Sequence, residues 1–459
     1  MPPLEELRTA AWYGDRSLPL SFPPDWEVST LRPDTPPPLS DSQIIEAFAH
    51  PVGQPPLRRL AAKRVRPLII VDDLTRPTPC ARIMPFLLEE FRQAGVRATD
   101  ITVLMATGTH GPPRADAMVK KIGSEAATQC RLIVHDDTRD VVRVGRTSFG
   151  TPVYVNRQVP ASDHIVGIGG IYPQHSTGFG GGSKLALGVL GRRSITRLHF
   201  GHRSVGGSYD IENDFRRELD EIARIIGLNS LISLQVDAGR RPVRIVTGDW
   251  ELFYGDEVAF AKQAYRAPLP VDADVVISNA YPIDVSLTFM RSKGVIPLVH
   301  AAPHASKILI SACSEGVGYH GLFPFISTSK LDRPRRVARS AMARPGSVPQ
   351  MVAGRLKRKL KSRTGRGNQP AEQTATFHEQ RSSSFPIWLY LPEQVSLPER
   401  IPGMQKVDSW PGILDRVAGE QAGRGTLKVV IYPCSPVQVL DIPSVKGASL
   451  VPSGLQDVD

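Results

Sequence analysis

A glycine-rich segment that ends in a lysine carries the densest chemistry of this chain. It reads Gln174-His175-Ser176-Thr177-Gly178-Phe179-Gly180-Gly181-Gly182-Ser183-Lys184. Glycine has no Cβ, so a turn of this composition lets the backbone approach a ligand closely. Lys184 could contact a phosphate or serve as a covalent attachment point. The alternative interpretation is a tight turn with a solvated lysine.

A helix is expected downstream of this turn, and it carries His199 and His202. Residues three apart share one face of a helix, so one or both imidazoles could ligate a metal. Alone, such a pair is more often found in packing or at the surface. The common phosphate-binding motifs do not fit the turn. Leu185 stands where a P-loop has its magnesium-binding hydroxyl, and no acidic residue lies at the distance that a Rossmann ribose contact needs.

Two further loops with polar side chains directly follow apolar runs typical of buried parallel strands. Asp72-Asp73-Leu74-Thr75-Arg76 follows residues 67–71, and Ala106-Thr107-Gly108-Thr109-His110 follows residues 101–105. In α/β sheets, ligands bind outside the carboxyl ends of the strands. Arg76 could therefore clamp a carboxylate or phosphate. The alternatives are an acidic loop before a helix and a structural histidine.

A fourth group lies in the second half of the chain. Residues 278–284 follow another strand-like run, and Lys293 comes shortly after them. This group could face the first three across a cleft between domains, where ligands often bind, or it could be a helix-capping turn. We interpret His300, His304 and His320 as structural or surface residues.

Strand and helix patterns alternate along the chain, which predicts an α/β fold of two domains with largely parallel sheets and an active-site cleft between them. We place the boundary near residue 268, giving domains 1–268 and 269–459. The expected strands are residues 67–71, 101–105, 131–134, 273–277, 307–310 and 428–431. The expected helices are residues 81–94, 114–122, 214–226 and about 286–293, and residues 231–246 are expected to form a hairpin.

Composition argues for a soluble enzyme. The hydrophobic fraction is 41%, which is ordinary for a globular protein, and no apolar stretch has membrane-spanning length. The N-terminus lacks the layout of a signal peptide. The cysteines form no CxxC pair, which suits a reducing compartment; they are Cys80, Cys130, Cys313 and Cys434. We therefore expect a cytoplasmic protein with no membrane partner.

The formal net charge of +11 is local. Residues 330–366 hold 13 Lys and Arg against one acid, Asp332, so the rest of the chain is close to neutral. We interpret residues 330–382 as a flexible basic insertion. RNA binding through it is a minority hypothesis, because it has little aromatic interleaving to stack bases, and it would show as salt-sensitive binding.

Taken together and in order, these motifs resemble the nickel-dependent lactate racemase family over roughly residues 65–320. Each piece is weak alone, but the ordered set is specific. The matching pieces are Asp73-Leu74-Thr75-Arg76-Pro77-Thr78-Pro79, Ala106-Thr107-Gly108-Thr109-His110, Gly178-Phe179-Gly180-Gly181-Gly182-Ser183-Lys184, His199, Ser278-Asn279-Ala280-Tyr281-Pro282-Ile283-Asp284, Lys293-Gly294 and Cys313-Ser314-Glu315-Gly316.

The resemblance implies a nickel-pincer nucleotide between the domains. This is the nickel complex of pyridinium-3,5-bisthiocarboxylic acid mononucleotide, whose sulfur and carbon atoms hold the metal. By match, Lys184 can attach it through a thioamide, and His199 completes the nickel coordination, for which a neutral imidazole is suited. His202 remains a backup ligand. The other residues implied in cofactor binding are Asp73, Thr75, Arg76, Gly178, Gly180, Gly181 and Gly182. Separate cofactor-synthesis proteins are implied as partners.

The implied reaction is hydride transfer from the carbon of a small 2-hydroxy acid, the substrate, to the cofactor, followed by its return on either face. By match, His110 is a general base for the hydroxyl proton. Arg76 and Lys293 would hold the cofactor and the substrate carboxylate, where cations fix orientation. The chain would then be an isomerase, a racemase or epimerase of 2-hydroxy acids.

The sequence departs from the family pattern at two places. The second family base falls on Gln174, which cannot act as a base near neutral pH; His175 beside it would need a shift of one residue. Phe289 and Met290 stand where the lactate enzyme has a tyrosine and a glutamine, which predicts a more apolar pocket and a substrate larger than lactate. The basic insertion has no clear family counterpart.

Two other hypotheses stay open on the sequence. One is a relative with one base that performs redox chemistry or epimerisation on a sugar acid. The other is a non-catalytic nucleotide- or anion-binding protein that has lost the second base.

Overall fold

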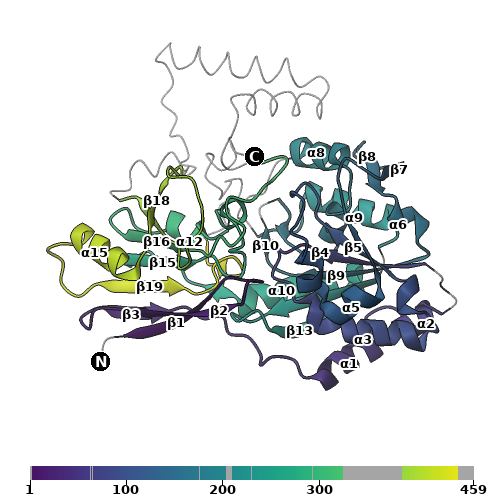
Figure 1. The fold of residues 1–459 in the computed structure, drawn as a ribbon, viewed down its shortest axis with the longest axis horizontal. Helices are drawn as coiled ribbons and strands as arrows, with labels where there is room; N and C mark the ends of the chain where they lie inside the picture. The colour runs from purple at the N-terminus through teal and green to yellow at the C-terminus, as the bar shows by residue number, and fades with distance from the viewer. Residues whose placement is uncertain are drawn as a thin grey trace, which may run out of the picture.

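Two largely parallel β-sheets, each with its own helices, organise the chain (Figure 1). The computed structural model describes residues 3–62, 64, 66–174, 176–202, 209–228, 230–291, 293–323 and 385–442. His175 and the basic insertion predicted at 330–382 lie outside the described residues. The α/β fold class with two largely parallel sheets is confirmed.

The first sheet has the strand order β13-β12-β9-β4-β5-β6, and only β13 runs antiparallel to its neighbour. Its strands are β4 (Pro67–Asp72), β5 (Thr102–Ala106), β6 (Arg131–Val134), β9 (His164–Gly170), β12 (Ser230–Val236) and β13 (Pro242–Asp249). Along β4, Ile69 and Val71 enter the core on one face, and Leu68 and Ile70 enter the core on the other. Because successive side chains of a strand point to opposite faces, an unbroken apolar run is what a sheet covered on both sides requires.

Helices cover both faces of the first sheet (Figure 1). The helix α3 buries Ile83, Leu87 and Phe91, whose spacing of four residues places them on one side. The helices are α1 (Asp41–Ala49), α2 (Leu57–Leu60), α3 (Cys80–Gln93), α4 (Ala117–Ile122), α5 (Ser124–Gln129), α6 (Gln158–Ala161), α7 (Lys184–Leu187), α8 (Arg192–Gly201), α9 (Asp214–Ile225) and α10 (Trp250–Ala264), with a 3-10 turn at Ala98–Asp100. The small hairpins are β7 (Val141–Arg146) with β8 (Pro152–Asn156), and β10 (Pro173–Gln174) with β11 (Gly178–Phe179).

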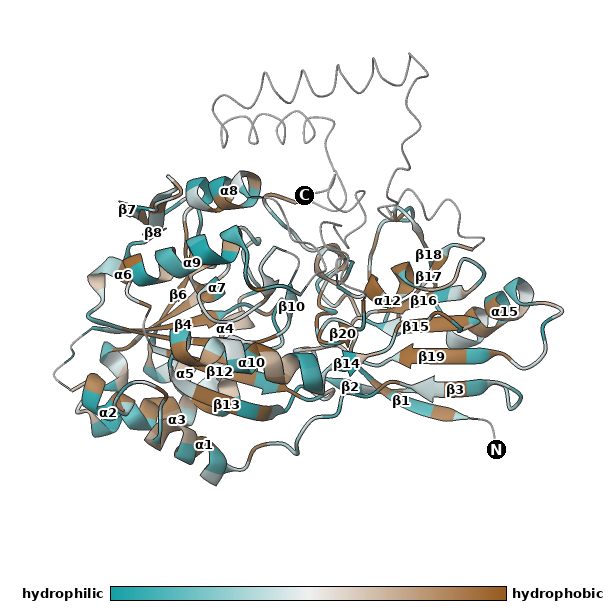
Figure 2. Cartoon of the chain, turned by 180° about the vertical axis from the view of Figure 1, so that it is seen from behind, coloured by the Kyte–Doolittle hydropathy of each residue, from teal (hydrophilic) through white to brown (hydrophobic). Residues whose placement is uncertain are grey.

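The second sheet is parallel throughout, with the order β18-β17-β16-β15-β19-β3. Its strands are β3 (Glu27–Thr30), β15 (Val275–Asn279), β16 (Ser306–Ile310), β17 (Ile387–Tyr390), β18 (Met404–Val407) and β19 (Lys428–Tyr432). The helices of this half are α11 (Leu287–Met290), α12 (Ile296–Val299) and α15 (Trp410–Glu420), and β14 (Arg266–Ala267) pairs with β20 (Val439–Leu440). Figure 2 shows the apolar character of β19 and the mixed character of the helices outside the sheets.

The N-terminal segment crosses to the second half of the molecule. β1 (Leu4–Thr9) and β2 (Arg16–Ser21) form a hairpin, and β3 then joins the edge of the second sheet beside β19. A single division near residue 268 therefore does not describe this segment. The hydrophobic pattern of the N-terminal segment is weak at β3, because β3 is an edge strand without a fully buried residue. The helix expected over residues 286–293 is also shorter, because only Leu287–Met290 is helical.

Asp284 fastens the N-terminal segment to the second half. Its buried carboxylate accepts hydrogen bonds from the backbone N–H of Ala10 at 2.8 Å and of Ala11 at 3.1 Å. Burial raises the pKa of Asp284 to about 6, against the opposing effect of these backbone donors. Buried backbone N–H groups need an acceptor, so the carboxylate that these two groups share holds the turn in place.

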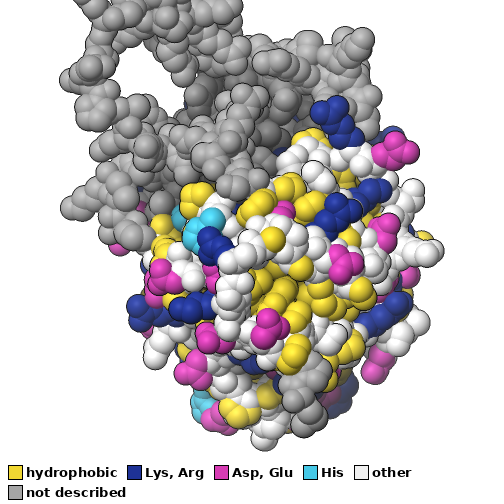
Figure 3. Space-filling model, turned by 90° about the vertical axis from the view of Figure 1, so that its left-hand side faces the viewer, with side chains coloured by type: hydrophobic (Ala, Val, Ile, Leu, Met, Phe, Trp, Pro, Cys, Tyr) yellow, Lys and Arg dark blue, Asp and Glu magenta, His cyan; other side chains and the backbone are white. Residues whose placement is uncertain are grey.

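The surface that the second half presents at its end carries charged side chains of both signs among apolar ones (Figure 3). All four cysteines are buried and unpaired. Within the described ranges, no helix combines the length and the apolar character needed to cross a membrane.

We predict that Asp284→Ala lowers the free energy of unfolding by about 2–4 kcal/mol, because two buried N–H groups lose their acceptor. Urea unfolding followed by fluorescence measures the change. Asp272→Ala, at an exposed position of the same half, serves as the matched control. Equal midpoints for the two variants would show that the carboxylate does not hold the N-terminal turn.

Candidate active site

The carboxyl ends of β4, β5 and β9 converge on a cavity with an empty volume of about 730 Å³. β4 lies between β5 and β9: the strands that follow β4 are added first on the β5 side and later on the β9 side. The point where the order of strands reverses in this way is the usual ligand position of an open parallel sheet. A second cavity of about 890 Å³ adjoins it on the side of the second sheet. The two share five lining residues, Arg76, His110, Gln174, His199 and His320.

Asp73 and His110 form a hydrogen-bonded pair across β4 and β5. Asp73 Oδ2 lies 2.5 Å from His110 Nδ1, and Asp73 Oδ1 accepts from the backbone N–H of Thr75 at 3.0 Å and from its hydroxyl at 2.5 Å. Burial alone would raise the pKa of Asp73, but the charge and the hydrogen bond of His110, with the charge of Arg76, outweigh burial and lower it. An ionised carboxylate can only accept, so Nδ1 of His110 carries a proton and Nε2 is left to accept one.

Arg76 lies at the junction of the two cavities. Its guanidinium donates to the Thr75 hydroxyl at 3.0 Å and stands 5.8 Å from the ring centroid of Tyr172. Beneath this loop, Lys121 forms a buried ion pair with Asp72 and donates to the carbonyl oxygen of Arg76 at 3.3 Å. Sequence reasoning missed Lys121 and Tyr172, because both look like ordinary residues of a helix and a strand end.

The glycines of the Gln174–Lys184 segment are needed mainly for packing within the protein. A Cβ at Gly178 would meet a backbone oxygen at 2.2 Å, at Gly180 the ring of Tyr172 at 2.8 Å, and at Gly182 the ring of Tyr254 at 2.7 Å. Gly181 lines the first cavity, and the other three do not. Of the four candidate glycines, Gly181 alone is thus placed to meet a ligand directly.

Arg216 of α9 holds the glycine segment in shape. It is buried and donates to the carbonyl oxygens of Phe179 and of Gly181, the latter at 3.1 Å, and to the Ser183 hydroxyl at 3.1 Å. The guanidinium also lies over the Tyr254 ring, 4.5 Å from its centroid. Its donors therefore satisfy carbonyl groups that a buried loop cannot expose to water.

Two lysines reach the cavities without a carboxylate partner among the described residues. Lys184 lines the first cavity, where burial and the positive charges of Arg76 and Arg216 lower its pKa well below the usual value. Lys293 donates to the carbonyl oxygen of Pro173 and to Gln174 Oε1, each at 2.7 Å. Burial, with the charges of Arg76 and Lys184, lowers the pKa of Lys293 as well.

His199 and His202 have different environments, although both belong to the end of α8. His199 Nδ1 donates to the carbonyl oxygen of Ile195 at 2.9 Å, so its Nε2 is left for another partner. Burial lowers the pKa of His199 to about 4, which makes the ring neutral at neutral pH. His202 Nε2 is engaged by Glu218, and its ring stacks on Phe215. The structure therefore favours His199 over His202 as a ligand.

The second half of the molecule closes the site with Phe289, which the sequence analysis named, and with residues that it missed. His320, interpreted from the sequence as structural or surface, is half-buried and lines both cavities, with its ring centroid 5.1 Å from that of His110. Phe289 lies 4.5 Å from the His110 centroid, and Phe323 and Arg291 line the second cavity. A single histidine in a glycine-rich loop gives no periodic signal that could have identified it.

Two expectations about this half need correction. Met290 is fully buried in the hydrophobic core of the second half and does not line either cavity, so Phe289 alone of the two makes the pocket apolar. The 278–284 segment does not face the site either. Asn279 donates to the carbonyl oxygens of Arg8 and Pro433, and Tyr281 donates to Asp15, so these residues join the N-terminal segment to the second sheet.

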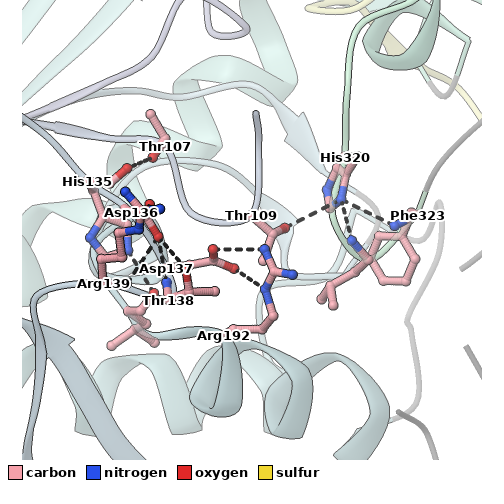
Figure 4. Close-up of polar contacts among 12 residues, drawn as sticks. Thr107, Thr109, His135, Asp136, Asp137, Thr138, Arg139, Arg192, His320 and Phe323 are labelled. Carbon is pink, nitrogen blue, oxygen red and sulfur yellow. Dashed lines mark hydrogen bonds and ion pairs between the residues drawn. The ribbon is translucent and has the colours of Figure 1, made fainter. Parts of the chain in front are cut away.

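Arg192 supports the site from outside the cavity. It begins α8 and donates to both oxygens of Asp137, at 2.6 Å and 2.9 Å, and His320 lies beside Thr109 in the loop after β5 (Figure 4). This bidentate pair fixes the start of the helix that carries His199. Among the described residues, no group of three or more His, Cys, Asp or Glu side chains is arranged to hold a metal ion.

The fold and the cavity define a two-domain α/β enzyme whose ligand site is rich in histidine and cationic residues. Residues 13–207 match the family model described as the lactate racemase N-terminal domain. The chain is 26% identical over 323 residues to the lactate racemase of Lactiplantibacillus plantarum, covering 67% of this chain and 74% of that protein. It is also 26% identical over 302 residues to the lactate racemase of Thermoanaerobacterium thermosaccharolyticum, covering 64% and 70%.

Two solved structures share the fold. The lactate racemase apoprotein from Thermoanaerobacterium thermosaccharolyticum aligns with a TM-score of 0.65 at 20% identity, over 96% of this chain and 100% of that one. A protein from Thermotoga maritima aligns with a TM-score of 0.54 at 16% identity, over 90% and 99%. With the sequence matches, these findings show that the chain is similar to lactate racemases and shares their fold.

We predict that Arg76→Met raises the pKa of Lys184, because a positive neighbour that opposes its protonation is removed. Acylation with a small amine reagent across a pH series, read at Lys184 by peptide mass spectrometry, should then have its midpoint at higher pH than in the wild type. Arg143→Met, at an exposed position of β7, is the control. Coinciding midpoints would mean that the Arg76 charge does not act on this amine.

Proposed function

We propose that the protein racemises or epimerises a 2-hydroxy acid by reversible hydride transfer to a nickel-pincer nucleotide. The similarity to lactate racemases indicates a racemase, which is an isomerase. The observation that carries the mechanism is the cavity in which His110, oriented by Asp73, shares a wall with Lys184 and His199. It combines a base, an attachment point and a metal ligand.

The residues present fit the proposed cofactor. His199 offers Nε2 as a neutral donor because Nδ1 is held by a backbone carbonyl, the arrangement that commonly orients metal-binding histidines. One protein imidazole suffices for a nickel that the nucleotide already holds. Lys184 offers a desolvated amine, and Arg76 and Gly181 line the same cavity and would hold the anionic part of the nucleotide. When bound, the group would accept and return a hydride.

The chain's own residues then perform the proton transfer and the orientation. His110 Nε2 takes the hydroxyl proton, because the Asp73 carboxylate fixes the proton of the ring at Nδ1. Arg76 and Lys293 bind the substrate carboxylate, and a bound anion stabilises the charged form of Lys293 against its burial. Gln174 positions that ammonium through its side-chain oxygen.

The second cavity supports a substrate larger than lactate. Phe289 and Phe323 line it together with His110 and His320, and the rings meet at centroid distances of 4.5–6.0 Å. A methyl group would leave most of these faces without a contact. An aromatic or long apolar substituent would bury against them, which favours a 2-hydroxy acid of the 3-phenyllactate type.

The alternative is a homologue that binds a nucleotide or another anion but has lost the second base. Gln174 favours it, because this side chain is engaged with Lys293 and has no basic group. It predicts phosphate binding without nickel and no isomerisation of any hydroxy acid.

We predict that protein co-expressed with cofactor-synthesis proteins carries a mass adduct and near-stoichiometric nickel. Lys184→Ala should lose the adduct, and His199→Ala should lose the nickel, because each removes the group that holds its part of the cofactor. Intact-mass spectrometry and metal analysis read the two effects separately. His202→Ala, whose imidazole is paired with Glu218, is the matched control and should keep both.

Absence of adduct and nickel in the wild type would contradict the cofactor assignment, provided that a lactate racemase loads normally in the same host. The binding-protein alternative would then be preferred.

We further predict that the loaded enzyme isomerises 3-phenyllactate with a kcat/KM at least about tenfold above that for lactate, since burial of a phenyl group is worth about 2 kcal/mol. Phe289→Ala should remove most of this preference and leave lactate turnover nearly unchanged. Chiral chromatography of both acids provides the measurement. A preference for lactate would rule out the aromatic slot.

A further inference from the structure

His320 reaches the active site on a segment that the second half of the molecule sends over the cavity. The segment follows β16, and it pairs with the loop after β5 through an isolated β-bridge between His320 and His110. The backbone N–H of Gly321 donates to the carbonyl oxygen of Thr109 at 2.7 Å. These backbone contacts fix the two imidazoles side by side, with centroids 5.1 Å apart.

The two nitrogens of the His320 ring face different surroundings. Nδ1 accepts from the backbone N–H groups of Leu322 and Phe323, each at 3.3 Å, with the Thr109 hydroxyl at 3.4 Å (Figure 4). A backbone N–H can only donate, so Nδ1 carries no proton and the neutral ring has its proton on Nε2. Nε2 has no hydrogen-bond partner in the part of the chain that the structure describes, and the ring lines both cavities.

The surroundings of His320 keep the ring neutral. Desolvation of the ring is the main cause of a pKa well below the usual value, and the neighbouring His110, His199, Arg76 and Arg291 groups act in the same direction. Phe289 and Phe323 pack against the ring, with centroid distances of 6.0 Å and 5.1 Å.

We propose that His320 is a catalytic hydrogen-bond donor whose Nε2–H binds the substrate oxygen from which His110 Nε2 takes the proton. This inference rests on the proposed function and adds a residue to it. The two rings have hydrogen-bond partners of opposite kind at Nδ1. A carboxylate holds the Nδ1 proton of His110, whereas backbone N–H groups exclude a proton from Nδ1 of His320. One ring is therefore an acceptor toward the cavity, and the other is a donor.

The roles balance in the reaction. As the O–H bond breaks, its proton goes to His110 Nε2. A nickel-pincer nucleotide held by Lys184 and His199 would be the oxidant: it would accept the hydride of the C2–H bond while the C=O bond forms. His320 keeps its proton throughout. Negative charge develops on the oxygen while the proton leaves, and a fixed donor in a desolvated site stabilises it. In the return direction the same donor polarises the carbonyl group of the 2-keto acid.

A second base is a less suitable role for His320. To accept a proton at Nε2 while neutral, the ring would need its proton on Nδ1, facing two N–H groups that cannot accept it. Gln174 does not offer a base either. The geometry thus points to one base and one donor rather than to two symmetric bases.

The kinetic test compares His320→Leu with His320→Gln in enzyme loaded with nickel. Leucine removes the donor, and glutamine replaces it, because its amide NH2 falls near the position of Nε2. We expect His320→Leu to lower kcat for 3-phenyllactate by about 10- to 1000-fold, with KM within about threefold and nickel content unchanged. His320→Gln should recover at least about tenfold of the loss. His304→Leu, at an exposed histidine, is the control and should retain wild-type rates.

A second measurement on the apoprotein needs neither cofactor nor activity. Two-bond ¹H–¹⁵N correlations of ¹⁵N-histidine-labelled protein at pH 7, assigned with His320→Gln, should show His320 as the neutral Nε2–H tautomer and His110 with its proton on Nδ1. A protonated His320, or one with its proton on Nδ1, overturns the inference.

The outcomes separate the inference from the proposed function. If the wild type carries nickel but isomerises no 2-hydroxy acid, the proposed function fails and the inference fails with it. If the wild type is active and His320→Leu and His320→Gln are equally slow, or both equal to the wild type, only the inference fails.

Discussion

The site depends first on the hydrogen bond between the Asp73 carboxylate and His110 Nδ1. Burying a carboxylate is costly unless it is paired and hydrogen-bonded, and here the imidazole, the Thr75 N–H and hydroxyl, and the Arg76 charge together satisfy it. The bond requires β4 and β5 to be parallel neighbours, with Asp72 beside Ala106 at their carboxyl ends. The order of the sheet therefore places the base, and the carboxylate defines which ring nitrogen acts.

The remaining charges make the site a receptor for anions. The wall carboxylates, Asp72 and Asp73, are already engaged by Lys121 and His110, whereas Lys184 and Lys293 lack a carboxylate partner in the described residues and have lowered pKa values. Desolvated ammonium groups become favourable when an anion binds beside them. A nucleotide phosphate and a substrate carboxylate would each provide that charge, so binding energy and protonation are coupled in this cavity.

Sequence patterns could predict the scaffold because its signals are periodic. The apolar run of β4 and the spacing of Ile83, Leu87 and Phe91 in α3 follow directly from burial on both faces of a sheet. The strand-end residues Asp73, Arg76 and His110 were predictable for the same reason. His320 was not, because a backbone bridge between two loops brings it to the site, and no local pattern records a contact between residues 210 positions apart. The edge strand β3 was missed because it is short and has no fully buried residue. Met290 was misplaced because a motif match does not say which way a side chain points.

Gln174 stands where the family pattern has its second base. It is better understood as a hydrogen-bond acceptor for Lys293 than as the mere loss of that base. A histidine there could not offer the amide oxygen to which Lys293 Nζ donates at 2.7 Å. Because glutamine does not titrate, its side-chain oxygen remains an acceptor for the Lys293 amine at any pH. Another group in the cavity must then stabilise the charge on the substrate oxygen. Nδ1 of His320 accepts from backbone N–H groups, so its Nε2–H can donate a hydrogen bond to that oxygen and keep its proton throughout the reaction. An asymmetric pair of imidazoles, one bound to a carboxylate and one to amides, is a physically sufficient replacement for two equal bases.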